Sequence, residues 1–121
     1  LKISLSKTYK SIDGIVATNT TVSRPLDTEV HPHVSQTGGL SGAPLATLSH
    51  RVITELRQHT PSEFPVIGVG GIMDAASAQA AFSAGATLVQ LYSGLIYRGP
   101  ALVREILGAL QAAQTAKVAT S

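Results

Sequence analysis

Three short stretches of this sequence carry residue types that could bind a ligand. Thr18-Asn19-Thr20 follows an apolar run, and its asparagine offers both a hydrogen-bond donor and an acceptor to an amide or a carboxylate. Gly70-Gly71 ends a second apolar run, and Tyr92-Ser93-Gly94 ends a third. Bare glycine backbone that leads into a helix is typical of anion-binding sites. An Asx-type turn at Asn19 and a tight turn at Gly70-Gly71 are the alternatives that need no ligand.

A fourth candidate is the glycine-dense stretch Thr37-Gly38-Gly39-Leu40-Ser41-Gly42. It could bring backbone close to a flat ligand, and a flexible lid is the alternative. It lies within residues 22–44, a long polar connection rich in proline and glycine. Connections of that length inside a compact domain are usually functional.

The elements that would position these stretches alternate between strands and helices. Apolar, β-branched runs predict strands at Gly14–Thr18, Val66–Val69 and Ala86–Tyr92, the second of them buried on both faces. Helical periodicity predicts helices at Ala43–His59 and Ala75–Ala84, and a third that starts at Gly99-Pro100. The apolar period of this third helix fades after Gln111, so we expect the tail to fray.

Residues at the helix ends support these boundaries. Asp74 is a favoured N-cap residue, and Gly85 occupies the position that follows a helix C-terminus. The buried face of the last helix is predicted to carry Leu102, Ile106 and Leu110. The spacing of Leu5, Tyr9 and Ile12 also predicts an early helix that ends near Ile12.

The order β-α-β-α-β-α implies parallel strands joined by right-handed crossovers. Three such strands alone would leave two open edges and one uncovered face. The fold class predicted is therefore α/β, as the C-terminal three βα units of a (β/α)₈ TIM barrel, with residues 1–121 as one partial domain. A small doubly wound domain is the alternative. In such a barrel functional groups gather at the carboxyl ends of the strands, and phosphate often binds after the last two strands, beside a short extra helix.

Composition excludes several classes of protein. The chain has 121 residues, 44% of them hydrophobic and 13% charged, which fits one globular domain at most. Its net charge of +2 comes without a basic cluster, so no nucleic-acid surface is expected. The absence of cysteine excludes a disulfide framework and a thiolate nucleophile. No apolar run approaches the roughly 20 residues that span a bilayer. No signal peptide opens the chain, and the missing initial methionine suggests a fragment.

Histidines and charged residues are weaker candidates. His31 and His33 flank a proline, so a metal site is possible, although loop histidines are more often solvated. His50 and His59 have no carboxylate at ligand spacing. Arg51, Glu55 and Arg57 fit a solvated helix face, and Asp13 and Asp74 fit turn and cap positions.

Four stretches in register resemble the C-terminal part of a dihydroorotate dehydrogenase, and the wording is closest to the quinone-linked, membrane-associated class. They are Ile12-Asp13-Gly14-Ile15-Val16-Ala17-Thr18-Asn19-Thr20-Thr21, Ser35-Gln36-Thr37-Gly38-Gly39-Leu40-Ser41-Gly42-Ala43-Pro44-Leu45, Val66 to Ile72, and Leu88-Val89-Gln90-Leu91-Tyr92-Ser93-Gly94. The resemblance implies an FMN-containing barrel that oxidises dihydroorotate to orotate in pyrimidine synthesis. In that family a base removes a proton from C5 of the substrate, a hydride passes from C6 to the flavin, and a quinone reoxidises the flavin.

Site residues follow from the resemblance position by position. Residues that match cofactor contacts are Thr18 and Gly42, with Gly71, Tyr92 and Ser93 on the phosphate side of FMN. Asn19 and Thr20 match residues that hold the polar edge of the substrate. The family's catalytic base is a serine on an earlier loop, so no catalytic residue is expected in this chain. Lys2 resembles a flavin-binding lysine but lies too near Thr18 in sequence, and we leave it out of the site.

The resemblance also carries expectations about partners and leaves alternatives. Membrane and quinone contacts are expected only from N-terminal helices that this chain lacks, and the full-length enzyme is expected at a bacterial or mitochondrial inner membrane. The isolated chain is expected to be inactive. One alternative is a non-catalytic remnant that binds FMN or phosphate weakly, or that associates with a second copy. Another is a different phosphate-binding barrel enzyme, against which the stretches around Asn19 and Gly39 argue.

Overall fold

The structure is a computed structural model, and it describes residues 11–22 and 37–120. The prediction of an early helix, the position of Lys2 and the possible metal site at His31 and His33 therefore lie outside the described residues. Ile12 itself is described, and it precedes the first strand outside any α-helix.

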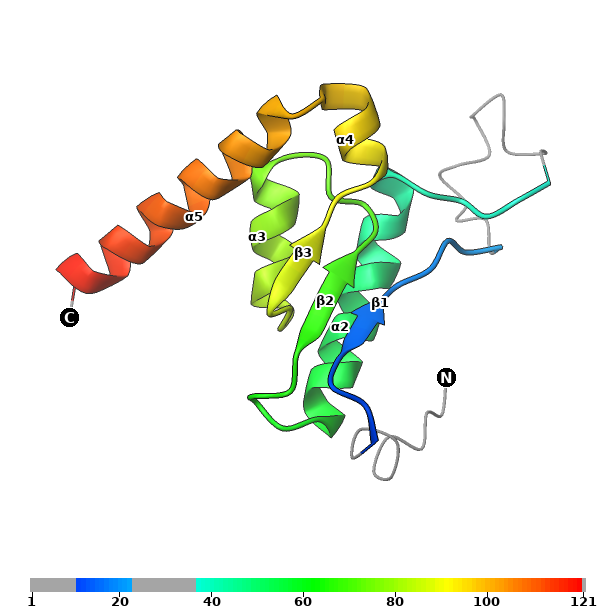
Figure 1. Cartoon of the computed structure of the whole chain (residues 1–121), viewed down its shortest axis with the longest axis horizontal. Coiled ribbons are helices and arrows are strands. Elements are labelled where there is room, and N and C mark those ends of the chain that lie inside the picture. The colour runs from blue at the N-terminus through cyan, green and yellow to red at the C-terminus, as the bar shows by residue number, and fades with distance from the viewer. Residues whose placement is uncertain (1–10, 23–36, 121) are drawn as a thin grey trace.

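Parallel strands and helices alternate along the described chain (Figure 1). The elements are β1 (Ile15–Ala17), the 3₁₀-helix η3 (Ala43–Leu45), α2 (Ala46–His59), β2 (Val66–Val69), α3 (Ala75–Ser83), β3 (Leu88–Gln90), α4 (Ser93–Arg98) and α5 (Ala101–Ala119). The strands form one parallel sheet in the order β1-β2-β3, so β2 pairs with both neighbours. The predicted βα order and parallel pairing are confirmed.

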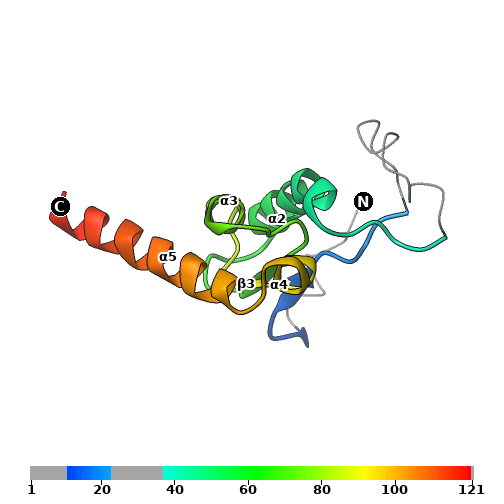
Figure 2. The same cartoon turned by 90° about the horizontal axis from the view of Figure 1, so that it is seen from above.

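Within residues 11–22 and 37–120, helices cover one face of this sheet and leave the other open. α2 packs on β1 and β2, α3 packs against β3, and both helices lie on the same side of the strands in the view from above (Figure 2). On the opposite face the strand register aligns Val16, Ile67 and Leu88 in one row. Val16 and Leu88 are each 57% exposed. This uncovered apolar face is the one expected of a barrel segment, because barrel strands carry helices outside and point their other side chains inward.

Two predictions about burial are wrong for the same reason. β2 was expected to be buried on both faces, but Ile67 and Val69 are only half-buried. The apolar residues Leu88, Val89 and Leu91 were expected to supply the bulk of the third strand; Val89 and Leu91 pack on the core, but Leu88 points to the open face. The apolar residues of these strands are the ones that a complete barrel would bury on both faces. In the described part of this chain, no other elements cover the inner face of the strands.

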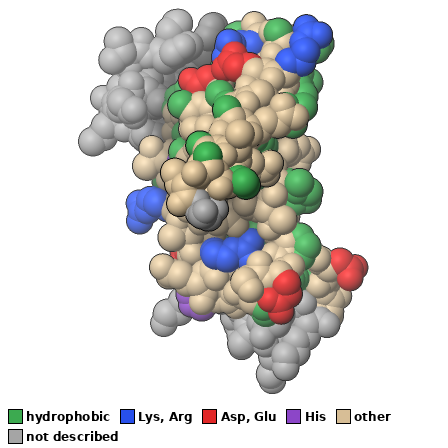
Figure 3. Space-filling view, turned by 90° about the vertical axis from the view of Figure 1, so that its left-hand side faces the viewer, with side chains coloured by type: hydrophobic (Ala, Val, Ile, Leu, Met, Phe, Trp, Pro, Cys, Tyr) green, Lys and Arg blue, Asp and Glu red, His purple; other side chains and the backbone are tan. Residues whose placement is uncertain are grey.

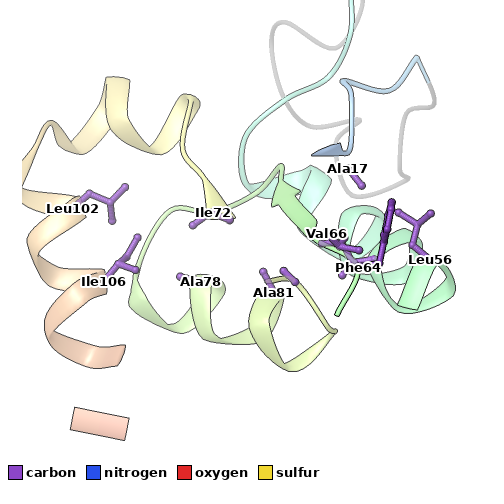
Figure 4. Packing of buried hydrophobic residues seen from close by; sticks show 11 residues of the cluster. Ala17, Leu56, Phe64, Val66, Ile72, Ala78, Ala81, Leu102 and Ile106 are labelled. Carbon is purple, nitrogen blue, oxygen red and sulfur yellow. The ribbon is translucent and has the colours of Figure 1, made fainter. Parts of the chain in front are cut away.

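The core lies between the sheet and the helices (Figure 4). Ile53, Val66 and Leu102 are fully buried at its centre. Small residues set the spacing: Ala78 and Ala81 on α3 are buried, which lets that helix approach the strands closely. Leu102 and Ile106 extend from α5 toward α3 and join the last helix to the same cluster. The predicted apolar face of α5 is thus confirmed.

The ends of the helices agree with their capping residues. The Asp74 carboxylate accepts from the Ser77 amide at 2.7 Å, and the Ser77 hydroxyl accepts in turn from the Asp74 amide at 3.0 Å. This capping box starts α3 as predicted. Gly85 follows the helix with φ +115°, a conformation that favours glycine. The helix predicted from Ala43 begins instead as η3, with a proline in its first turn, and becomes α2 at Ala46.

The C-terminal part of the chain differs from the prediction in two ways. The third strand is Leu88–Gln90 rather than Ala86–Tyr92, because the chain leaves the sheet and starts α4 at Ser93. α5 does not fray after Gln111 but continues to Ala119. Alanine, glutamine and lysine have high helix propensity, so this segment stays helical although residues 111–120 are exposed. Figure 1 shows this end of α5 projecting from the other elements.

The sequence suggested that Arg57 belongs to a solvated helix face, and this prediction is wrong. Its guanidinium donates to the Gly85 carbonyl at 3.0 and 2.8 Å, to the Phe64 carbonyl at 3.0 Å and to the Pro61 carbonyl at 3.0 Å. It also reaches the Thr87 hydroxyl at 3.2 Å. These bonds join α2 to the two loops that lead into β2 and β3. A planar group with five N–H donors can serve several carbonyls at once, which a lysine cannot.

Replacing Arg57 with alanine is expected to lower the free energy of unfolding by about 2–3 kcal/mol, since charge-assisted bonds to partly buried carbonyls are lost. Urea denaturation measures the change. Arg51→Ala, on the exposed side of the same helix, is the matched control and should change stability by less than about 0.5 kcal/mol. Equal effects of the two substitutions would contradict the role assigned to Arg57.

Acid should destabilise the start of α3. The Ser77 backbone and hydroxyl hydrogen bonds hold the pKa of Asp74 below its ordinary value of 3.8. A carboxyl whose pKa is lower in the folded state contributes stability above its unfolded pKa, and that contribution is lost as pH falls through the folded value. Stability should therefore drop below about pH 4, and Asp74→Asn should drop less. Urea denaturation at pH 7 and pH 3 measures both proteins, and an unchanged drop in the variant would refute the assignment.

Candidate functional site

A cavity of about 480 Å³ opens at the carboxyl end of the sheet. It is lined by segments that are far apart in the sequence: the end of β1, the start of η3, the turn after β2 and the start of α4. Every site residue predicted from the sequence lines this one cavity: Thr18, Asn19, Thr20, Gly42, Gly71, Tyr92 and Ser93. Of the glycine-dense stretch before η3, only Ser41 and Gly42 belong to the lining.

The β1 side of the cavity is held by backbone pairing. The Thr18 amide donates to the Val69 carbonyl at 2.9 Å, which extends the β1-β2 ladder to the rim. The peptide bond between Ala17 and Thr18 is cis. Farther on, Thr21 and Leu40 exchange backbone hydrogen bonds of 3.2 and 2.7 Å. This bridge fixes the segment with Asn19 and Thr20 beside the segment that leads to Gly42.

The glycine turn after β2 is explained by packing. Gly70 and Gly71 have φ values of +113° and +75°. A Cβ atom on Gly71 would collide with the backbone of Ala46, and one on Gly70 would lie 2.8 Å from Leu45 Cδ2. The buried Ser49 hydroxyl donates to the Val69 carbonyl at 2.9 Å, which ties α2 to this turn. The close approach of α2 therefore requires glycine here whether or not a ligand binds.

The third wall is the start of α4. Ser93 is the first residue of this helix, and its hydroxyl donates to the Ser41 hydroxyl at 3.3 Å. Amides in the first turn of a helix have no acceptor within the helix, so they are available to a ligand. Gly94 is buried, and a Cβ there would collide with the Ile72 carbonyl and lie 2.9 Å from Leu102 Cδ2. α4 is therefore packed directly against the segment that follows the Gly70-Gly71 turn.

The cavity has a neutral lining. Its polar groups are hydroxyls, carboxamides and backbone amides, and among the described residues that line it none is Asp, Glu, His, Lys or Arg. The described chain also has no group of three metal-ligating side chains. On the face drawn in Figure 3 the charged side chains are scattered rather than gathered into a patch. The lining of the cavity can therefore hold a neutral or anionic ligand by dipoles and hydrogen bonds.

Several lining residues were missed by the sequence reasoning. Leu45, Ile72 and Met73 supply apolar wall, and Val16 and Gln90 lie on the strands themselves. The signal for the last two was the alternation of side chains along a strand: residues that alternate with core-facing positions must face the barrel interior. Leu45, Ile72 and Met73 carried no such signal, because the path of their loops depends on tertiary packing.

None of the helices in the part of the chain that the structure describes is both long and apolar enough to cross a membrane. This finding concerns the described residues alone. The longest of them, α5, carries its apolar side chains on one stripe and includes Arg104, Glu105 and Lys117.

Comparison with known proteins points to one family. A family model described as dihydroorotate dehydrogenase matches residues 2–113. Dihydroorotate dehydrogenase (quinone) of Flavobacterium lutescens is 54% identical over 100 residues, which cover 83% of this chain and 28% of that protein. The protein of the same description from Cupriavidus taiwanensis is 57% identical over 100 residues, covering 83% of this chain and 29% of the relative.

Solved structures agree with these sequence matches. The crystal structure of DHODH from Eimeria tenella in complex with ferulenol superposes with a TM-score of 0.78 at 33% identity, covering 88% of this chain and 28% of that one. The ligand-free structure from the same organism gives a TM-score of 0.74 at 36% identity, over 81% of this chain and 27% of that one. The chain thus spans little more than a quarter of the proteins that it matches. Together with the parallel sheet covered on one face, these matches show that the chain belongs to the dihydroorotate dehydrogenase family and forms part of its TIM barrel.

Proposed function

We propose that this chain forms one side of the FMN and substrate site of a dihydroorotate dehydrogenase (quinone), which oxidises dihydroorotate to orotate in pyrimidine synthesis. The observation that carries the proposal is the convergence of the predicted residues. They come from separate stretches of the sequence, yet all of them line the single cavity at the carboxyl end of the sheet. That edge is where barrel enzymes of this architecture bind their ligands.

The lining fits FMN in size and in chemistry. A volume of about 480 Å³ is typical of a small-molecule site. The Gly70-Gly71 turn and the start of α4 line the same cavity, and backbone amides at such a turn and helix start would suit a phosphate. Gly42 has φ +78° and nothing nearer to a Cβ than Ser93 at 3.8 Å, so backbone there can approach a flat ring closely. Hydroxyl and carboxamide groups at Thr18 and Asn19 suit the polar edges of a ring.

Each residue has a proposed role in binding. The backbone of Gly71, with Tyr92 and the Ser93 hydroxyl, holds the FMN phosphate. Thr18 and Gly42 make further contacts with the cofactor. Asn19 and Thr20 bind the polar edge of dihydroorotate or orotate, for which the asparagine carboxamide supplies a donor and an acceptor.

In this proposal the residues of this chain bind the ligands, and other groups carry out the chemical steps. When bound, FMN would supply the acceptor for the substrate hydride, and a quinone would reoxidise it. The residues of this chain bind and orient, since the described lining holds no Asp, Glu, His, Lys or Arg and none of its residues matches the family's catalytic serine. We place the catalytic base, the quinone contacts and the association with an inner membrane in the parts of the parent enzyme that this chain does not span.

A flavin titration tests the proposal. FMN added to the purified chain should bind, seen as a change in flavin fluorescence, and riboflavin should bind more weakly because it has no phosphate. Ser93→Ala should reduce the preference for FMN over riboflavin. Equal binding of the two flavins would contradict the phosphate assignment, and no binding of FMN would overturn the proposal. The chain alone should not oxidise dihydroorotate, and measurable turnover would refute the assignment of the chemical steps to other groups.

A second candidate function is favoured by the uncovered face of the sheet. The row Val16, Ile67 and Leu88 would let a non-catalytic segment associate with a second copy of itself. Light scattering distinguishes the two candidates: a monomer that binds FMN supports the first, and a dimer that binds no flavin supports the second.

A further inference from the structure

Gln90 is the last residue of β3, and although it lies within one of the four stretches that resemble the family, none of the roles proposed above uses it. Val89, its neighbour, packs on the hydrophobic core, so the Gln90 side chain points to the opposite, open face of the sheet. There it lines the same cavity as the predicted site residues. Gln90 therefore stands on the floor of the cavity, below the rim formed by Tyr92 and Ser93.

The strand register gives the position of Gln90 across the floor of the cavity. Val69 pairs with Gln90, and the Thr18 amide donates to the Val69 carbonyl, so Thr18, Val69 and Gln90 lie side by side on adjacent strands. With strands about 4.8 Å apart, Gln90 lies roughly 10 Å from Thr18. On the same face of the sheet, the next row toward the amino ends of the strands is entirely apolar and consists of Val16, Ile67 and Leu88. Gln90 is thus the one carboxamide on the floor formed by the described strands, and it lies on the strand that leads into α4.

The carboxamide of Gln90 has no hydrogen-bond partner among the described residues, whereas the hydroxyls of Ser49 and Ser93 on neighbouring walls do. A polar side chain inside a barrel would be buried, and buried carboxamides are almost always hydrogen-bonded. A ligand that fills the cavity would cover Gln90 and could supply that partner.

We propose that Gln90 is a further ligand-binding residue, whose carboxamide hydrogen-bonds the hydroxyl-bearing chain that joins the phosphate of FMN to its ring. The inference rests on the proposed function and names a contact that it does not include. In the proposed site the phosphate would be held at the start of α4, next to Gln90 along the chain, and the ring would be held toward Thr18 across the sheet. The linking chain must cross the floor between these ends. Its hydroxyls are both donors and acceptors, and a carboxamide matches them in both senses.

The test compares two identical substitutions in the whole chain. Gln90→Leu keeps the approximate volume and removes the carboxamide, and Gln79→Leu makes the same change on the exposed surface of α3. We expect Gln90→Leu to weaken FMN binding about tenfold, the effect of one or two hydrogen bonds. Gln79→Leu should bind FMN as the parent chain does. The melting temperature of the unliganded Gln90→Leu variant should not fall, because no protein contact is lost.

Each outcome decides the inference. If the parent chain binds FMN and Gln90→Leu binds it equally well, the inference fails while the proposed function stands. Weaker binding together with a lower melting temperature would show a structural role and also overturn it. Lumiflavin, which has the flavin ring without the hydroxyl-bearing chain, provides a further test. If Gln90→Leu also weakens lumiflavin binding tenfold, Gln90 contacts the ring and not the linking chain, and the inference is wrong. If the parent chain does not bind FMN, the proposed function fails and the inference fails with it.

Discussion

Replacing Gly71 with alanine is expected to lower the free energy of unfolding by about 3–5 kcal/mol, enough to unfold a marginally stable domain. Two effects add. The backbone has φ +75°, which is unfavourable for a residue with a side chain. The new Cβ would also collide with the backbone of Ala46 at the first turn of α2. Backbone cannot rotate away as a side chain can, so α2 or the turn must shift. Thermal and urea unfolding of both proteins measure the loss.

Gly99→Ala is the matched control for this prediction. Gly99 has a similar φ of +67°, but no atom lies within 4 Å of the position that a Cβ would take. It should lose only the conformational part, about 1–3 kcal/mol. The difference between the two variants then isolates the collision with α2. Equal losses would show that α2 yields easily, and would remove the packing explanation for glycine at position 71.

The elements of the fold were predictable where local chemistry decides them. Val66–Val69 has the predicted bounds, and α3 starts at Asp74 because a capping box is a local device that survives in any context. The end of the chain was mispredicted because burial was used as the criterion for helix. α5 continues to Ala119 on propensity without burial. The hydrogen bonds of Arg57 to Gly85, Phe64 and Pro61 could not be predicted either, because they join loops that are distant in sequence.

The clustering of the candidate site residues was predictable because parallel strands bring their carboxyl ends to one edge. Thr18, Gly71 and Ser93 follow three different strands, and the structure places all three around one cavity. Residue type was a poorer guide than position. Gly71 suggested an anion-binding turn, yet its packing on α2 requires glycine with no ligand present. Position on the rim, together with family membership, is therefore what supports a binding role for this turn, and only its backbone can serve that role.

Replacing Leu102 with alanine should lower the free energy of unfolding by about 2–5 kcal/mol, the range for large-to-small changes at fully buried sites. Leu102 is 0% exposed and belongs to the central cluster. The Leu102 side chain packs closely against the buried start of α4, since a Cβ on Gly94 would lie 2.9 Å from Leu102 Cδ2. The substitution should therefore also affect the proposed ligand site. Urea denaturation measures the stability, and an FMN titration below the unfolding transition should show weaker binding.

Leu107→Ala on the same helix makes the same chemical change at a side chain that is 53% exposed. It should cost less than about 1 kcal/mol, since most of that side chain is already in water. If the two substitutions destabilise equally, α5 does not dock through Leu102 in solution. If Leu102→Ala destabilises the chain but leaves FMN binding unchanged in the folded fraction, then α4 holds its position without this contact. In that case the turn after β2, which is fixed by Ser49 and α2, is sufficient to form the proposed phosphate-binding side of the cavity.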